Sequence, residues 1–168
     1  SRLGLDIKLN GKVGDDTYGR LIKELLGKKR ASSFKTVTGQ SSSYTIVLAL
    51  PGIDRIFLHH PGTNDTFKAE DIDDDALDKC LMFHFGYPTL MKRMYENGGQ
   101  ELYQIFKKAK HKGVVTSLDM TLPDPKSASG QADWETILKR VLPLVDIFCP
   151  SIEEIAYMLD RPLFEKRK

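Results

Sequence analysis

The second half of the sequence alternates short apolar runs with amphipathic segments, and this order constrains the fold more than any other feature. Apolar residues recur at helical spacing after each strand-like run. The runs and the helices that follow them are residues 81–87 and 101–113, 114–120 and 134–145, and 146–150 and 151–159. Strands that alternate with helices predict a parallel sheet with right-handed crossovers. We therefore expect an α/β core over about residues 66–168.

Two β-rich runs in the first half do not fit that alternation. Residues 42–50 and 54–60 are separated by "PGI", which is typical of a hairpin turn. We predict that they pair as antiparallel strands with one apolar face that covers a cleft. This flap occupies about residues 35–62.

Three further elements are expected along the chain. The alternating "LDIKLN" at 5–10 predicts a strand, and "GKVGDD" at 11–16 predicts a turn. Residues 16–29 have the apolar spacing of a helix. The acid-rich stretch 69–81 is typical of a helix N-terminus and predicts another helix.

Composition excludes several classes of protein. The chain has 168 residues, enough for one domain, and its 25 Lys and Arg nearly balance its 23 Asp and Glu. The sequence has no basic stripe of the kind that indicates nucleic-acid binding. No apolar run reaches the roughly 18 residues of a membrane span. Cys80 and Cys149 lie in apolar runs and are expected to be buried free thiols, which favours a reducing compartment and a cytoplasmic protein.

Familiar catalytic and metal motifs are absent from the sequence. There is no P-loop, no G-x-S-x-G elbow, no HxxxH pair and no G-x-G-x-x-G after a strand. The acidic run from Asp71 resembles a calcium loop, but Ala76 stands where that loop needs Gly and Met82 where it needs Glu. Candidate site residues must therefore come from the fold. Ligands of parallel α/β folds bind at the carboxyl ends of the strands, which indicates residues 84–87, Asp119 and 150–154.

Several segments together resemble the ribokinase, or PfkB, family of carbohydrate kinases. "NGKVGDDTYGRLIKELL" is similar to the family's G-x-V-G-x-D-x-x-G stretch and the helix after it. The hairpin and the turn after it resemble the family's flap, with Thr45, Gly52, Arg55, Gly62 and Asn64 at the matching positions. "VVTSLDM" resembles the strand that opens the D-x-N-x-R segment, and "LVDIFCPSIEEIAYML" resembles the strand and helix that carry N-x-x-E.

The resemblance implies a ribokinase-like three-layer α/β/α fold with a parallel central sheet and a small antiparallel flap. It also implies phosphoryl transfer from ATP to a sugar hydroxyl, with Mg²⁺ as cofactor. The family's G-A-G-D motif, which supplies the catalytic base, does not occur in residues 1–168. We therefore expect an internal, partial ribokinase-like domain that contains no catalytic residue and is inactive alone. A homodimer formed through the flap is also expected.

The resemblance further implies two groups of site residues. Those on the sugar side are Gly11, Phe57, His59, Asn64, His84 and Tyr87. Those on the phosphate side are Asp119, Ser151 and Glu154, with Glu154 acting on Mg²⁺ through water. Core packing is an equal alternative for His84 and Tyr87, and a structural turn is an alternative for the glycines from Gly11 onward.

The sequence departs from the family at two motifs. Thr121 and Pro123 replace the Asn and Arg of D-x-N-x-R, and Ser151 replaces the Asn of N-x-x-E. A Ser with Glu three residues later is also a helix capping box, so Ser151 and Glu154 have a purely structural alternative. A non-catalytic sugar- or nucleoside-binding domain, or a nucleoside kinase of the same family, therefore remains open beside the sugar kinase. The sequence does not specify the sugar.

Overall fold

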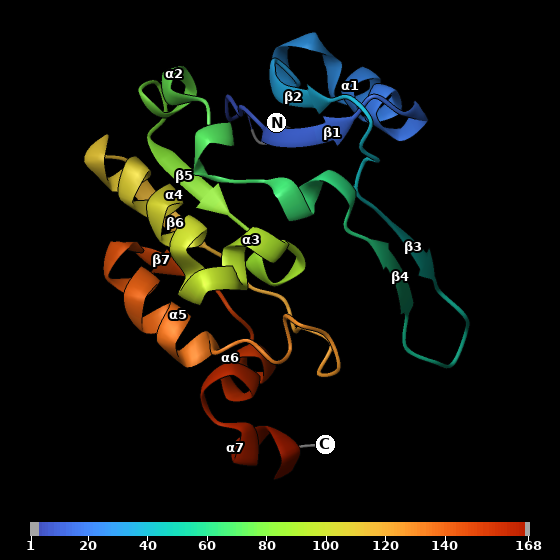
Figure 1. Cartoon of the computed structure of the whole chain (residues 1–168), viewed down its shortest axis with the longest axis vertical. Helices are drawn as coiled ribbons and strands as arrows, with labels where there is room; N and C mark the ends of the chain where they lie inside the picture. The colour runs from blue at the N-terminus through green and yellow to red at the C-terminus, as the bar shows by residue number, and fades with distance from the viewer. Residues whose placement is uncertain (1–3, 167–168) are drawn as a thin grey trace. The chain divides into compact units, whose positions relative to one another are not determined.

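The computed structural model describes residues 4–166, and the chain divides into two compact units, residues 1–67 and 68–168. Figure 1 shows the order of elements within each unit. The first unit contains β1 (Asn10–Gly14), α1 (Thr17–Arg30), β2 (Ser33–Val37), β3 (Tyr44–Leu48), β4 (Ile56–His60) and the 3₁₀ helix η1 (Gly62–Thr66).

The strand β1 corrects the expected start of the chain. A strand at 5–10 followed by a turn at 11–16 was wrong, because the extended segment begins at Asn10 and pairs in parallel with β2 through Gly14. Its glycines provide space rather than a turn. A Cβ at Gly11 would stand 2.7 Å from the Phe34 ring, and one at Gly14 would overlap the Gln40 carbonyl. Composition therefore indicated a turn where close backbone approach is the actual requirement.

Asp16 begins α1 and joins it to the segment before β3. Its carboxylate accepts hydrogen bonds from Gly19 N, Ser42 N and Ser42 Oγ, each at 2.7 Å. The bonds from the Ser42 hydroxyl, the Ser42 N–H and the Gly19 N–H lower the pKa of Asp16 to about 2. The predicted cap is confirmed, and the predicted helix at 16–29 is confirmed as α1.

β3 and β4 form the predicted antiparallel hairpin. Their register runs from Tyr44↔His60 to Leu48↔Ile56. Neighbouring residues such as Ile46 and Val47 point to opposite faces, and both are exposed. Apolar side chains are thus exposed on both faces of the hairpin, although the alternation predicted one apolar face.

The second unit contains a parallel three-stranded sheet in the order β5-β6-β7. The elements are β5 (Met82–Phe85), β6 (Val115–Leu118) and β7 (Ile147–Phe148), with α2 (Asp74–Leu77), α3 (Lys92–Tyr95), α4 (Gln100–His111), α5 (Trp134–Val141), α6 (Ile152–Leu159), α7 (Arg161–Lys166) and the 3₁₀ helices η2 (Ala69–Asp71), η3 (Pro88–Leu90), η4 (Glu96–Gly99) and η5 (Leu142–Leu144). This order confirms the alternation predicted for the second half. None of the helices in residues 4–166 is long and apolar enough to cross a bilayer.

The helix expected at 69–81 was wrong, because only the four residues of α2 are α-helical there. Aspartate favours caps over helix interiors, and the Asp73 side chain accepts from Asp75 N to start α2 late. The irregular backbone before it is held by Lys108, whose Nζ donates to the carbonyls of Ala69 and Ile72.

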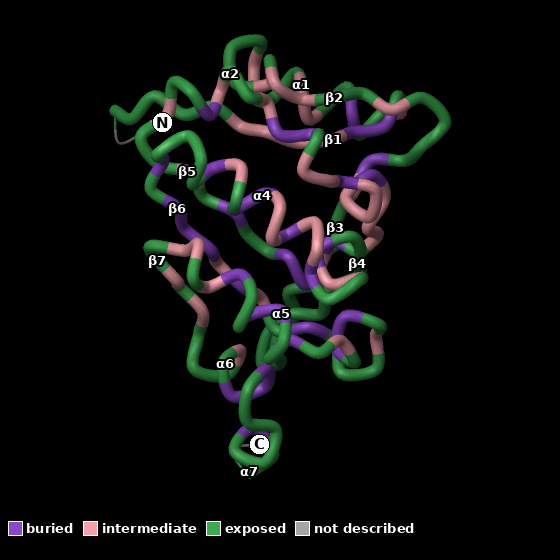
Figure 2. The backbone as a smooth tube through the Cα atoms, turned by 60° about the vertical axis from the view of Figure 1, so that its left-hand side comes forward, coloured by how far each residue is buried: buried purple, intermediate pink, exposed green. Residues whose placement is uncertain are grey.

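The core of this unit lies between the sheet and α4. Buried residues recur along α4 (Figure 2), and the Phe106 ring meets the rings of Phe83 and Phe85 at centroid distances of 5.9 and 6.3 Å. The expected burial of both cysteines was wrong. Cys80 is half-buried and Cys149 is exposed, because Cys149 follows Phe148 and so points to the sheet face that α4 does not cover.

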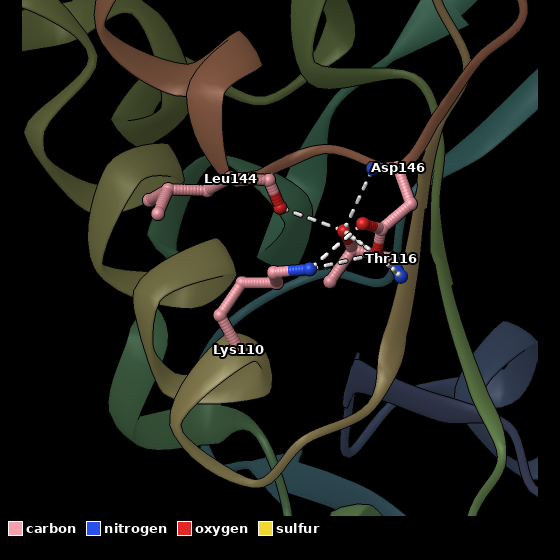
Figure 3. Close-up of polar contacts among 4 residues, drawn as sticks. All are labelled: Lys110, Thr116, Leu144 and Asp146. Atoms are coloured by element: carbon pink, nitrogen blue, oxygen red, sulfur yellow. Dashed lines mark hydrogen bonds and ion pairs between the residues drawn. The ribbon is translucent and has the colours of Figure 1, made fainter.

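One polar cluster fixes β7 against β6 (Figure 3). The buried Thr116 hydroxyl lies 2.6 Å from the Leu144 carbonyl oxygen and 3.0 Å from Asp146 Oδ2. Asp146 Oδ2 also accepts from Thr116 N at 2.8 Å, and Lys110 Nζ lies 2.8 Å from Asp146 Oδ1. The bonds from Lys110, the Thr116 N–H and the Thr116 hydroxyl lower the pKa of Asp146 to about 2.

This cluster predicts a pH-dependent stability. A carboxyl group whose pKa falls on folding stabilises the protein above its unfolded pKa and loses that contribution as pH falls through the folded pKa. For Asp146 the window runs from about pH 4 down to about pH 2. Asp146→Asn should lower stability at neutral pH and flatten its pH dependence in that window, as measured by urea unfolding. Asp75→Asn, at an exposed carboxylate, is the control, and equal pH profiles for all three proteins would contradict the prediction.

Candidate functional site

The carboxyl ends of β5, β6 and β7 lie side by side. Phe85 pairs with Leu118, and Leu118 pairs with Phe148. Two bonds continue this ladder by one residue, from Asp119 N to Phe85 O at 2.9 Å and from Cys149 N to Leu118 O at 3.0 Å. The segments that follow the three strands therefore leave from one edge of the sheet. These segments carry four of the predicted site residues, namely Tyr87, Asp119, Ser151 and Glu154, and a fifth, His84, lies near the end of β5.

His84, Gly86 and Asp119 border a common point on this edge. A Cβ at Gly86 would stand 3.4 Å from Asp119 Cβ and 3.6 Å from His84 Nε2. His84 is exposed, so the core-packing alternative does not describe it. Asp119 is half-buried, and its Oδ1 accepts from Met120 N at 2.9 Å. The His84 imidazole and the Cβ of Asp119 thus border the same small space left by a glycine.

Tyr87 projects from the next position and is 47% exposed. It is not a core residue, and it precedes a tight 3₁₀ turn, η3, whose Pro88 and Thr89 are buried. The Thr89 hydroxyl is a buried oxygen with no hydrogen-bond partner among residues 4–166. An aromatic ring held by a packed turn can stack on an apolar ligand face.

Ser151 and Glu154 form the capping box of α6. Glu154 N donates to Ser151 Oγ at 3.3 Å, and Ser151 N donates to Glu154 Oε2 at 2.7 Å. The structural alternative for these residues is therefore correct as geometry. It uses only one carboxylate oxygen, and Glu154 Oε1 has no hydrogen bond within the described part of the chain. The cap orients the carboxylate and leaves one oxygen available.

The candidate oxygen donors at this edge are compatible with one mode of magnesium binding, through water. Residues 4–166 contain no group of three or more His, Cys, Asp or Glu side chains able to hold a metal. Mg²⁺ commonly keeps several waters and is held by one or two carboxylates together with substrate phosphates. A single oriented carboxylate such as Glu154, acting through water, is compatible with that mode.

The remaining predicted residues belong to the unit of residues 1–67. Gly11 lies in β1 with its free space filled by the Phe34 ring, which supports the structural alternative for this position. Asn64 lies in η1 and is half-buried. Gly11 and Asn64 thus sit in packed backbone of that unit.

Phe57 and His59 share one face of β4, because they are two residues apart. Phe57 is 56% exposed, and the Arg55 guanidinium lies 5.5 Å from its ring centroid. Across the hairpin, His59 Nδ1 lies 2.8 Å from Thr45 Oγ1, and desolvation lowers the pKa of the His59 imidazole. This face of the flap presents an aromatic ring and a polar ring side by side.

One residue of the strand edge, Ser117, was missed from the sequence, whereas Gly86 lies within the indicated range 84–87. Ser117 Oγ lies 3.1 Å from His84 Nδ1, and Gly86 opens the space between His84 and Asp119. Strand alternation contained the signal for Ser117, because it stands two residues before Asp119 and so shares its face. The pairing of Ser117 with His84 depends on the β5–β6 register, which the sequence does not specify.

The departures from D-x-N-x-R lie in the loop after β6. Thr121 is half-buried and Pro123 is buried, so neither position presents a cation at the sheet edge. Asp119 therefore has no arginine from its own motif beside it.

Comparison with known proteins shows which family the chain belongs to. A sequence profile of the pfkB family of carbohydrate kinases matches residues 1–168. The chain belongs to this family. An uncharacterized sugar kinase of Archaeoglobus fulgidus is 29% identical over 159 residues, which are 92% of this chain and 58% of that protein. Probable fructokinase-7 of Arabidopsis thaliana is 25% identical over 172 residues, covering 94% of this chain and 46% of its own length.

The fold of this pfkB family chain is also similar to a solved structure. Fructokinase with bound ATP from Xylella fastidiosa superposes with a TM-score of 0.76 at 20% identity, over 96% of this chain and 50% of that one. The predicted ribokinase-like α/β fold with a small antiparallel flap is confirmed. The pfkB chain spans about half the length of the curated relatives it matches.

Proposed function

We propose that this pfkB family chain is a segment of an ATP-dependent sugar kinase. The observation that carries the proposal is the match of the family profile along all 168 residues. The grouping of His84, Tyr87, Asp119 and Glu154 at one sheet edge supports it, since ligands of parallel α/β folds bind there.

In this proposal the residues of the segment bind and orient the sugar and supply the carboxylate of Glu154. His84, Asp119 and Tyr87 bind and orient the sugar, with Tyr87 placing its exposed ring against an apolar face of the sugar. Gly11, Phe57, His59 and Asn64 of residues 1–67 are proposed as sugar-binding residues on the resemblance of their segments to the family. Ser151 holds the Glu154 carboxylate in place through the capping box. The base that takes the hydroxyl proton is not among these residues.

Magnesium would neutralise charge on the transferred phosphoryl group when bound. Glu154 is the residue of this segment that would orient its water, because one carboxylate oxygen has no bond within residues 4–166. Asp119, which the resemblance places on the phosphate side, is proposed here to bind a sugar hydroxyl instead of the ion.

A non-catalytic sugar-binding domain is the second candidate. The observation that favours it is the altered D-x-N-x-R motif, where Thr121 and Pro123 replace the Asn and the Arg. Activity of the full gene product separates the two candidates.

The flap is proposed as the contact between two copies of the protein. β3 and β4 expose apolar side chains on both faces, and a two-stranded hairpin is marginal when it stands alone. A second hairpin packed against it would remove this apolar area from water.

The proposal predicts that the 168-residue chain alone has no sugar kinase activity, because G-A-G-D is absent from it. The full product of the gene should phosphorylate a sugar with ATP in a coupled assay, with D-fructose and D-ribose as the first substrates. Turnover by the purified chain, unchanged in amount through successive purification steps, would contradict the first part. A gene product that binds sugar without turnover would favour the second candidate.

Glu154→Gln in the full gene product tests the phosphate-side role. The change keeps shape and most capping geometry but removes the charge, so kcat should fall on the order of tenfold to a thousandfold and the magnesium dependence should shift. Ser151→Ala is the matched control, because it removes the cap at a cost of about 1 kcal/mol in unfolding free energy and keeps the carboxylate. Normal kcat and normal magnesium dependence in Glu154→Gln would leave only the structural role.

Leu58→Lys tests the flap contact. Leu58 is 53% exposed and stands opposite Ile46, so a charge there should split a flap-mediated dimer into monomers. Light scattering after gel filtration of the full gene product gives the mass. Leu25→Lys, at an apolar residue of α1 that is 75% exposed, should leave the dimer intact. A monomeric wild type at high protein concentration would refute the contact.

A further inference from the structure

One buried hydroxyl stands behind the polar residues of the sheet edge. Ser117 is 4% exposed, and its Oγ lies 3.1 Å from Nδ1 of the exposed His84. This is the one hydrogen bond that the Ser117 side chain makes within residues 4–166. The two residues are register partners on β5 and β6, and both side chains point to the face that α4 does not cover.

The direction of the bond follows from what the hydroxyl would otherwise lose. If His84 Nδ1–H donated to Ser117, the Ser117 O–H would be a buried donor with no acceptor among the described residues. A buried unsatisfied donor costs about 1–3 kcal/mol, whereas an empty lone pair on an oxygen that already takes part in a bond is better tolerated. The Ser117 hydroxyl therefore donates to His84 Nδ1. The neutral imidazole then carries its proton on Nε2.

The other side of the same point offers an acceptor. Asp119 Oδ1 is occupied by Met120 N, while Asp119 Oδ2 has no hydrogen bond within residues 4–166. Both Asp119 Cβ and His84 Nε2 lie within 3.6 Å of the place where a Gly86 side chain would begin. His84 Nε2 thus borders the space that this glycine leaves open, and the Asp119 carboxylate is carried by the Cβ atom on the other side of that space.

We propose that Ser117 is a positioning residue that fixes the Nε2–H tautomer of His84, so that His84 Nε2–H and Asp119 Oδ2 together hold one substrate hydroxyl in the space over Gly86. A hydroxyl accepts one bond and donates another, so it satisfies both partners at once. A carboxylate or phosphate at the same point would meet the Asp119 carboxylate and be disfavoured. The bound sugar hydroxyl rests on the proposed function. The tautomer of His84 does not depend on it.

The tautomer is measured directly, without reference to activity. Nitrogen-15 NMR of histidine-labelled full gene product at about pH 8, above the ordinary histidine pKa of about 6.5, distinguishes Nε2–H from Nδ1–H. The His84→Gln spectrum identifies the His84 signals among the histidines. We expect the Nε2–H form in the wild type and in Ser117→Thr, and a mixture of both forms in Ser117→Ala. An Nδ1–H form in the wild type, or an unchanged tautomer in Ser117→Ala, overturns the proposal.

Sugar kinetics then test the hydroxyl. Ser117→Ala should raise KM for the sugar on the order of tenfold, as for one lost hydrogen bond, and leave KM for ATP unchanged. Ser117→Thr should restore it, and His84→Gln, which keeps an N–H donor, should be less impaired than His84→Ala. A role in stability alone would lower Tm in Ser117→Ala without changing the sugar KM, and that result overturns the proposal.

Gly86→Ala gives a test that leaves the hydrogen bonds in place. The added methyl group would make only ordinary contacts at 3.4 and 3.6 Å, so the fold and the His84 tautomer should be kept. It would occupy the place of the hydroxyl and should raise the sugar KM at least as much as Ser117→Ala. An unchanged sugar KM overturns the proposed hydroxyl position. The expected tautomers without turnover of any sugar would refute the proposed function instead and leave the role of Ser117 standing.

Discussion

The arrangement of the strand edge depends on the hydrogen bonds between Asp146 and Thr116. They fix where β7 begins against β6, and β7 has only two residues with which to define its own register. A slip of one residue would turn Phe148 away from α4 and bring Cys149 into the core, because side chains alternate between the faces of a strand. It would also move Ser151 and Glu154 relative to Asp119. The Asp146 carboxylate thus determines how the segments after β6 and β7 lie at the edge of the sheet.

The number of hydrogen bonds on each carboxylate oxygen distinguishes two structural aspartates from the candidate site carboxylates. Asp16 and Asp146 each accept bonds on both oxygens, and those bonds lower both pKa values to about 2. Such groups hold the backbone and have little capacity left for a ligand. Asp119 and Glu154 each use one oxygen for a local backbone bond, which orients the group and leaves the second oxygen available. This difference supports Asp119 and Glu154, rather than Asp16 and Asp146, as candidate site residues.

Sequence patterns predicted the features that local chemistry determines. The hairpin, the strand–helix alternation, the Asp16 cap and the Ser151–Glu154 capping box each depend on residues close together in the chain. The patterns failed where a distant partner decides, as in β1, whose glycines admit Phe34 and Gln40, and at residues 69–81, where Lys108 stabilises irregular backbone. Ser117 was missed for the same reason, since its pairing with His84 appears only when β5 lies beside β6.

The charge of the sheet edge indicates which groups of the proposed substrates it can bind. Asp119, Glu153 and Glu154 are acidic, and Pro123 removes the cation that the family motif places nearby. Neither Asp119 nor Glu154 forms an ion pair within residues 4–166. An edge of this sign repels an unaccompanied polyphosphate but accepts neutral hydroxyl groups through donor–acceptor pairs. In the proposed kinase, Asp119 therefore contributes recognition of the sugar, and Glu154 would act on the phosphates only through the water of a bound magnesium ion.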